Sequence, residues 1–138
     1  MDVNEKDGHG EVPLVIACKN QNEKIVKLLI HHGVEVNTKN ERNETPLTIA
    51  CNHASLSIIN MLLENGADIN GIGVNGATPL TMACKNENES LVEYLIKRDA
   101  DVNRKDSNND TPLAVACTTE NDSIIKLLID HGAYLNVK

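Results

Sequence analysis

Residues 45–70, TPLTIACNHASLSIINMLLENGADIN, hold the pattern that decides the fold. Thr45 and Pro46 predict the start of a helix, because the Thr oxygen can accept an orphan backbone N–H and proline loses no hydrogen bond at the first helical position. The apolar stretch after Ser55 predicts a second helix. Gly66 suits its end, because glycine takes the left-handed conformation without strain. The stretch therefore predicts two short helices followed by a turn.

The same pattern recurs along the chain with a period of 33 residues. All prolines share one register, at Pro13, Pro46, Pro79 and Pro112. All cysteines share another, at Cys18, Cys51, Cys84 and Cys117. A fixed period of this length is the mark of a repeat architecture, in which each unit buries its apolar face against its neighbours. The near absence of aromatic residues, at 1%, agrees with a thin aliphatic core of this kind.

The repeated unit resembles the ankyrin repeat. The resemblance rests on Thr-Pro-Leu, then Ala-Cys, then a Leu-Leu pair and then Gly-Ala-Asp-Ile-Asn, all on the 33-residue period. It implies an all-α solenoid of helix-turn-helix units joined by protruding β-hairpin loops. We divide the single domain, 1–138, into repeats at about 2–34, 35–67, 68–100 and 101–133, with 134–138 as the start of a truncated fifth.

The chain departs from the ankyrin pattern at several positions. The histidine that usually follows Thr-Pro-Leu is replaced, so the hydrogen bond it makes between repeats must be weakened or remade; the replacements are Val15, Thr48, Thr81 and Ala114. The glycine usual between the helices is replaced by Gln21, Ala54, Glu87 and Glu120. We expect the neighbouring Asn20 or Asn86 to take the left-handed conformation instead. Val12 lacks a capping hydroxyl and Asp99 replaces a helix-ending glycine, each at a cost of about 1 kcal/mol.

Two further registers carry short polar side chains that hydrogen-bond to the backbone. One of them is expected to cap the second helices, at Asn22, Ser55, Asn88 and Asn121. The other is expected to bond the local backbone where each hairpin starts, at Asn37, Asn70, Asn103 and Asn136.

Composition argues against several classes of partner. The formal net charge of −7 disfavours nucleic acid and anionic membrane surfaces, which attract basic proteins. No apolar run approaches the roughly 20 residues that a membrane helix needs. Residues 1–11 are polar and lack a signal-peptide pattern. We therefore expect a soluble protein whose partner is another protein.

The cysteines are not expected to form a disulfide or a metal site. Equivalent residues of stacked helices lie about 8–10 Å apart, whereas a disulfide needs Cα atoms within about 7 Å and zinc needs thiolates within ~2.3 Å of the metal. We predict buried, reduced thiols and, with them, a cytoplasmic protein. No nucleophile–base pair or phosphate-binding loop is readable, so we predict no cofactor, no metal and no enzymatic activity.

The positions that stacking leaves free to vary are the candidates for binding. In the ankyrin family the matching positions, at the hairpin tips and the exposed end of the first helix, line a concave groove that takes protein partners. By this correspondence the partner-binding residues are Glu41, Arg42, Glu44, Asn52, His53, Ile72, Val74, Asn75, Ala77, Lys85, Asn86, Ser107, Asn108, Asp110, Thr118 and Thr119. Arg42, Ile72 and Val74 are the expected anchors, and the alternative is that these loops are merely solvated.

The sequence favours a non-catalytic protein–protein interaction module. The alternatives are a structural spacer within a longer scaffold protein and an engineered ankyrin binder or scaffold, since the units are uniform in length. A free-standing solenoid needs polar capping repeats, yet the last second helix, 124–129, is as apolar as the inner ones. Either the chain is a piece of a longer array, or its uncapped terminal repeats associate end to end.

Overall fold

The structure, a computed structural model, describes residues 4–8 and 10–135. Their helices come in pairs: α1 (Pro13–Lys19) and α2 (Glu23–His31), α3 (Pro46–Asn52) and α4 (Leu56–Glu64), α5 (Pro79–Lys85) and α6 (Glu89–Lys97), and α7 (Pro112–Thr119) and α8 (Asp122–Asp130). A single 3-10 turn, η1 (Val74–Gly76), lies in the loop before α5. The predicted all-α repeat solenoid is confirmed.

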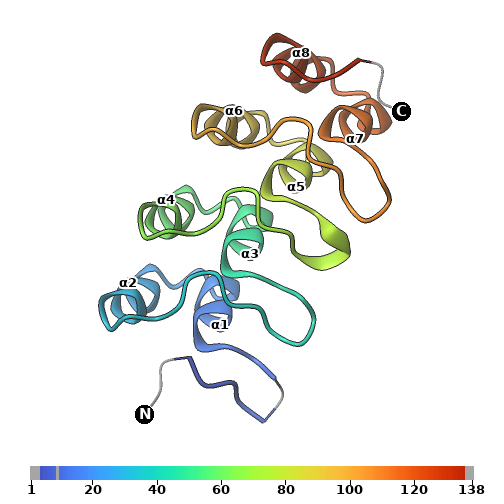
Figure 1. Cartoon of the computed structure of the whole chain (residues 1–138). Helices are drawn as coiled ribbons and strands as arrows, with labels where there is room; N and C mark the ends of the chain where they lie inside the picture. The colour runs from blue at the N-terminus through green and yellow to red at the C-terminus, as the bar shows by residue number, and fades with distance from the viewer. Residues whose placement is uncertain (1–3, 9, 136–138) are drawn as a thin grey trace.

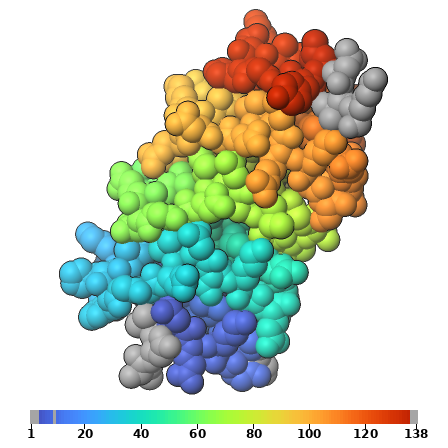
Figure 2. Space-filling view, in the orientation of Figure 1, coloured from blue at the N-terminus to red at the C-terminus, as the bar shows by residue number. Residues whose placement is uncertain are grey.

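The pairs stack along one axis in two layers of helices. The first helices of the pairs, α1, α3, α5 and α7, form an inner layer, and the second helices form an outer layer (Figure 1). Each first helix packs against the second helix of its own pair, and α1, α3 and α5 also pack against the first helix of the next pair. The loops between pairs project from the inner layer, on the side away from the outer helices (Figure 1). The space-filling view shows the stack as one continuous elongated body (Figure 2).

Small side chains allow the inner helices to approach one another. Ala50, Ala83 and Cys84 are fully buried, and larger aliphatic residues such as Ile58 and Leu95 of the outer helices fill the space behind them. Full burial of such an aliphatic side chain contributes roughly 1.5–3 kcal/mol. The core therefore runs as one strip along the stack, with no repeat able to bury its own apolar surface alone.

The predicted caps begin most of the helices. Thr45 and Thr78 accept the backbone N–H groups of Thr48 and Thr81, both at 3.1 Å, at the start of α3 and α5. Thr48 also donates to the Thr45 carbonyl at 3.1 Å, so the threonine that replaces the usual histidine hydrogen-bonds within its own repeat. Val12 gives α1 no side-chain cap, as expected.

The second helices are capped by asparagine in three cases. Asn22, Asn88 and Asn121 each accept a backbone N–H three residues on, at 3.0–3.2 Å. Ser55 does not cap α4, against the prediction; its hydroxyl donates to the Gln21 side chain of the preceding repeat at 3.2 Å.

The prediction of left-handed Asn20 or Asn86 is wrong. Both have φ near −85°, at −83° and −85°. The left-handed residues are those that replace the family glycine, Gln21, Ala54, Glu87 and Glu120, with φ of 52–57°. The reason is positional: the N–H of Gln21 bonds the Cys18 carbonyl and the next N–H bonds the Ala17 carbonyl, a pair that requires φ > 0 at that place whatever the side chain.

The asparagine register bridges neighbouring repeats, which corrects the prediction that it bonds the local backbone. Asn37 accepts the N–H of Asp68 at 2.7 Å and donates to the carbonyl of Gly66 at 3.0 Å, one repeat further along. Asn70 and Asn103 accept N–H groups of the following repeat in the same way, at 2.7 and 2.8 Å. The local site is unused because the next repeat brings its own unpaired backbone groups within reach. Asn136 lies outside the described residues.

The loops between repeats protrude, but the described residues form no paired strands. Each tip is closed by a turn; in the second loop the N–H of Asn40 bonds the Glu44 carbonyl at 3.2 Å and that of Asn43 bonds the Asn40 carbonyl at 3.1 Å. Two bonds close a turn and do not extend into a ladder, so the expected β-hairpin is reduced to its tip.

The cysteines are all free, and the expectation that all are buried is wrong for one of them. Cys18, Cys51 and Cys84 are buried, whereas Cys117 is exposed because no further repeat covers α7 in the structure. None of the described helices has the length and hydropathy needed to cross a membrane. Among the same residues, no cluster of three or more His, Cys, Asp or Glu side chains is arranged to hold a metal ion.

Candidate functional site

The predicted binding residues lie on the loop side of the stack, at the tips and at the C-terminal ends of the inner helices. Most are exposed to solvent: Glu41, Arg42, Asn52, His53, Ile72, Val74, Asn75, Lys85, Asn86, Ser107, Asn108, Asp110 and Thr118. Three are partly buried: Glu44, Ala77 and Thr119. The surface is therefore accessible, and its members differ in how far each is free to contact a partner.

One hollow of about 260 Å³ brings seven of the predicted residues together. Its lining includes Asn52, Val74, Asn75, Ala77, Lys85, Asn86 and Asn108. Sequence reasoning missed three further lining residues, Thr81, Met82 and Asp106. Thr81 and Met82 belong to the body of α5, which was assigned to packing, and their side chains form the floor that loop positions alone cannot reveal. We call this surface the α5 hollow.

The walls of the α5 hollow are held in place by hydrogen bonds. The Ser107 N–H donates to the Asn75 carbonyl at 3.1 Å, which joins the third and fourth loops. Asn86 donates to the side chain of Asn52 at 3.1 Å, which joins the ends of α5 and α3. Because both pairs are formed in the unbound chain, a partner would meet a largely ordered surface and lose less entropy on binding.

The three expected anchors do not share one site. Val74 lines the α5 hollow. Ile72 lines a different hollow of about 340 Å³, together with Val36, Leu47 and other residues of the second and third repeats. Arg42 lies at the tip of the second loop, in a network of charged side chains. Ile72 and Val74, two residues apart in one loop, thus line different hollows, which their spacing along the chain does not indicate.

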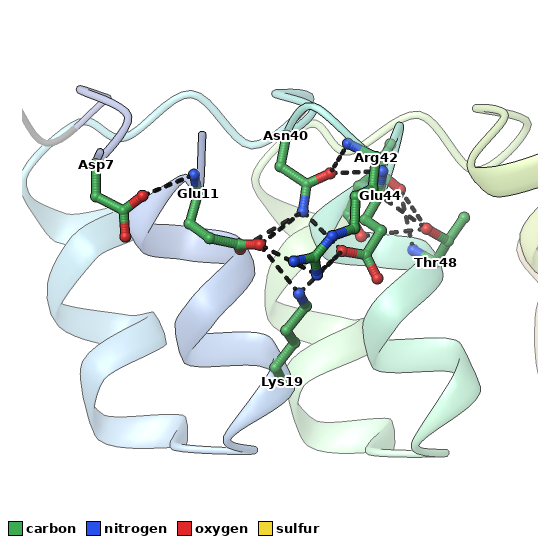
Figure 3. A network of polar contacts seen from close by, with 8 residues as sticks. Asp7, Glu11, Lys19, Asn40, Arg42, Glu44 and Thr48 are labelled. Atoms are coloured by element: carbon green, nitrogen blue, oxygen red, sulfur yellow. Dashed lines mark hydrogen bonds and ion pairs between the residues drawn. The ribbon is translucent and has the colours of Figure 1, made fainter. Parts of the chain in front are cut away.

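The charged network joins the first two repeats around Lys19 (Figure 3). The Lys19 ammonium lies 2.9 Å from the Glu44 carboxylate and 3.3 Å from that of Glu11. Asn40 donates to Glu44 at 2.7 Å, and the Arg42 guanidinium lies 3.5 Å from Glu11. Glu44 is only 18% exposed while Arg42 is 66% exposed. Glu44 therefore serves the packing of the loops, and Arg42 is the member most open to a partner.

Two pKa shifts follow from this network. The hydrogen bond with Glu44 raises the pKa of Lys19, outweighing the effect of partial burial, and Glu11 adds to it. Burial acts to raise the pKa of Glu44, but hydrogen bonds from Asn40 and Lys19 together with the neighbouring positive charges lower it overall. Both groups are thus held in their charged forms, as a salt bridge between repeats requires.

The hydroxyls of the last two predicted residues are already hydrogen-bonded. Thr118 donates to the Ala114 carbonyl at 3.1 Å and Thr119 to the Ala116 carbonyl at 2.9 Å, both within α7. Neither threonine lines the α5 hollow. They are the candidates with the least polar capacity left for a partner.

Comparison with known families gives one match. A family model described as ankyrin repeats, in three copies, matches residues 1–73 and 70–138. A comparison with curated proteins found no match.

Proposed function

The chain belongs to the ankyrin repeat family, whose members are generally protein–protein interaction modules, and we propose that it binds a partner protein through the α5 hollow and the loop tips around it. The single observation that carries this proposal is the convergence of seven predicted positions on one preorganised hollow. The proposal includes no catalytic step.

The chemistry of the α5 hollow supports a protein segment as ligand. Its lining offers the apolar surface of Met82 and Val74, and amides from Asn75 and Asn86 that can pair with a peptide backbone. Lys85 and Asp106 stand on the same rim with opposite charges. An apolar centre with a mixed polar rim is the usual anatomy of a protein interface.

The test is affinity purification from the native cell with the wild-type chain and with the double variant Val74→Asp, Lys85→Glu. Both side chains are exposed, so the variant is expected to fold. We expect a specific partner that copurifies with the wild type and is lost with the variant. Lys126→Glu, which reverses one lysine charge on the exposed surface of α8 as Lys85→Glu does in the α5 hollow, is the control and should retain the partner.

The main alternative is a structural spacer, in which the repeats set a distance between other parts of a scaffold. A spacer predicts that the double variant and the Lys126→Glu control copurify with the same proteins. That outcome, with both variants folded by circular dichroism, would overturn the proposal.

A second binding mode, end-to-end association of two copies, is favoured by the exposed last repeat. Ile129 is 41% exposed whereas its equivalent Ile96 is 9% exposed, and Cys117 is exposed where its equivalents are buried. At the other end, an apolar hollow of about 270 Å³ lies between Ile16, Ile25 and Leu29. Stacking one copy on the next would repeat the contact that joins successive repeats within the chain.

Light scattering across a range of concentrations tests this second mode. We expect mass to rise with concentration for the wild type and to stay that of a monomer for Ile129→Lys. A wild-type monomer at all concentrations would rule the mode out. We also propose a cytoplasmic location, supported by the free state of the cysteines, which fluorescence of a tagged chain in the native cell would test.

A further inference from the structure

A further hollow lies among the outer helices and is not part of the loop surface. It measures about 570 Å³ and is lined by α2 and α4, with Leu28, Ile30 and Met61 as its apolar members. Leu28 is 56% exposed, although its equivalents Met61, Tyr94 and Leu127 are partly buried. We call this surface the α2–α4 groove. The outer layer stands on the side of the stack opposite the loops (Figure 1).

Three side chains at the α2–α4 groove differ from those at the next junction, where side chains bridge the two helices. Between α4 and α6, the Tyr94 hydroxyl donates to Asn60 at 3.0 Å and Arg98 donates to the same oxygen at 3.3 Å. Arg98 also lies over the Tyr94 ring, at 5.7 Å from its centroid, so these side chains bridge the two helices.

The residues in the same register at the first junction are Lys27, Met61 and Asn65. They make no such bridge: Asn65 donates to the Met61 carbonyl of its own helix, at 2.7 Å. Lys27 stands where the next junction has the acceptor Asn60, and its ammonium can only donate. Met61 stands where the next junction has Tyr94, and it has no hydroxyl. The bridge between α4 and α6 therefore has no counterpart between α2 and α4, where the apolar groove lies.

The charge around the α2–α4 groove is opposite to that of the whole protein. Lys24 and Lys27 line it together with His31, and no carboxylate is among its lining residues. The chain as a whole has a formal net charge of −7. Positive side chains beside an apolar surface favour acidic ligands at this groove, because the net negative charge of the protein repels such ligands from the rest of the surface.

We propose that the α2–α4 groove docks an acidic amphipathic helical segment of a partner protein. An apolar face of that helix would cover Leu28 and Met61, and carboxylates beside it would meet Lys24 and Lys27. This is the helix-in-groove mode of recognition, with apolar anchors supplying affinity and charges supplying selection. The site is separate from the α5 hollow, so the chain would hold two different protein segments on its two sides.

The test uses a synthetic amphipathic helical peptide with leucines on one face and glutamates on both flanks. Binding is followed by amide chemical-shift changes in the ¹⁵N-labelled chain. We expect changes confined to α2 and α4, and a dissociation constant about tenfold weaker for Leu28→Ala, whose lost apolar contact area sets this scale. The variant Lys24→Glu, Lys27→Glu should weaken binding by a similar factor or more through reversed charge.

A variant that closes the groove separates shape from charge. Lys27→Asn, Met61→Tyr and Asn65→Arg together rebuild at this junction the bridge that the chain itself makes between α4 and α6. One positive charge is removed and one added, so the net charge is unchanged. We expect this variant to fold and to lose peptide binding.

The controls make every outcome informative. Lys126→Glu, in the same helix register as Lys27 but on α8, should bind the peptide as the wild type does. A peptide with lysines in place of the glutamates should not bind. No binding by the acidic peptide at millimolar concentration, equal binding by the lysine peptide, shifts in the loops, or binding that survives groove closure would each overturn the proposal. The Val74→Asp, Lys85→Glu variant should bind the peptide normally, so the two proposed sites can fail separately.

Discussion

At the scale of single residues, the cysteine thiol at one repeat position is buried in three repeats and exposed in the fourth. Burial raises the pKa of the thiols of Cys18, Cys51 and Cys84 to about 12. Since the thiolate is the reactive form, these thiols are almost entirely unreactive near neutral pH. Cys117 has the same place in its repeat but is exposed.

Thiol labelling of the native chain at pH 8 should therefore modify one cysteine quickly. We expect Cys117→Ser to abolish the fast phase, and denaturant to make all the remaining thiols reactive. Mass spectrometry after brief exposure to iodoacetamide checks this. Fast labelling of Cys51 in the native chain would contradict the burial described here.

A second residue-scale prediction concerns the end of α6. Asp99 has φ of 67°, in the region that Gly33, Gly66 and Gly132 occupy at the equivalent positions. Asp99→Gly should raise the free energy of unfolding by about 0.5–1 kcal/mol, because glycine adopts this conformation without a Cβ clash. Urea denaturation measures the change. Asp99→Ala, which removes the charge but keeps the Cβ, should give no stabilisation.

At the scale of elements, the network around Lys19 determines how the first two loops are held together. Glu44 has a lowered pKa, so its contribution to stability is complete above its ordinary pKa of 4.5 and is lost as pH falls through the lower folded value. Glu44→Gln should cost about 1 kcal/mol at pH 7, through one weakened charged hydrogen bond. The deficit relative to wild type should shrink below about pH 4.

Urea unfolding of both chains at pH 7, 5 and 3 measures this deficit. Glu41→Gln, on the exposed tip of the same loop, is the control and should behave as wild type at each pH. A deficit in Glu44→Gln that stays constant down to pH 3 would show that the carboxylate charge is not what holds the loops.

The same scale shows what the sequence could predict and what it could not. Helix pairs and threonine caps follow from local sequence rules, the repeat length follows from the 33-residue period, and the structure agrees with them. The bridges of Asn37 depend on a backbone segment that only stacking brings near. The α2–α4 groove is recognised only when Met61 is compared with Tyr94 at the next junction. Ile72 and Val74 line different hollows because of the path that their loop takes. These features are set by contacts between repeats or by the path of a loop, which local sequence rules do not contain.

At the scale of the whole molecule, stability should decrease toward both ends. Inner repeats pack against a neighbouring repeat on both sides, whereas α1 lacks a side-chain cap at Val12 and α7 exposes Cys117. We expect amide hydrogen exchange to be slowest in α3 and α5 and fastest in α1 and α8. Slowest exchange in α1 would contradict nearest-neighbour folding of this stack.

The asparagine bridges also bear on how the stack responds to tension. Asn37, Asn70 and Asn103 each tie one repeat to the following one, so a force pulling the two ends apart meets the bridges in series. Each bridge that yields frees one unit, about 110 Å of extended chain for 33 residues. Such a chain would lengthen under load in discrete steps of nearly equal size, and it would recoil as the units restack.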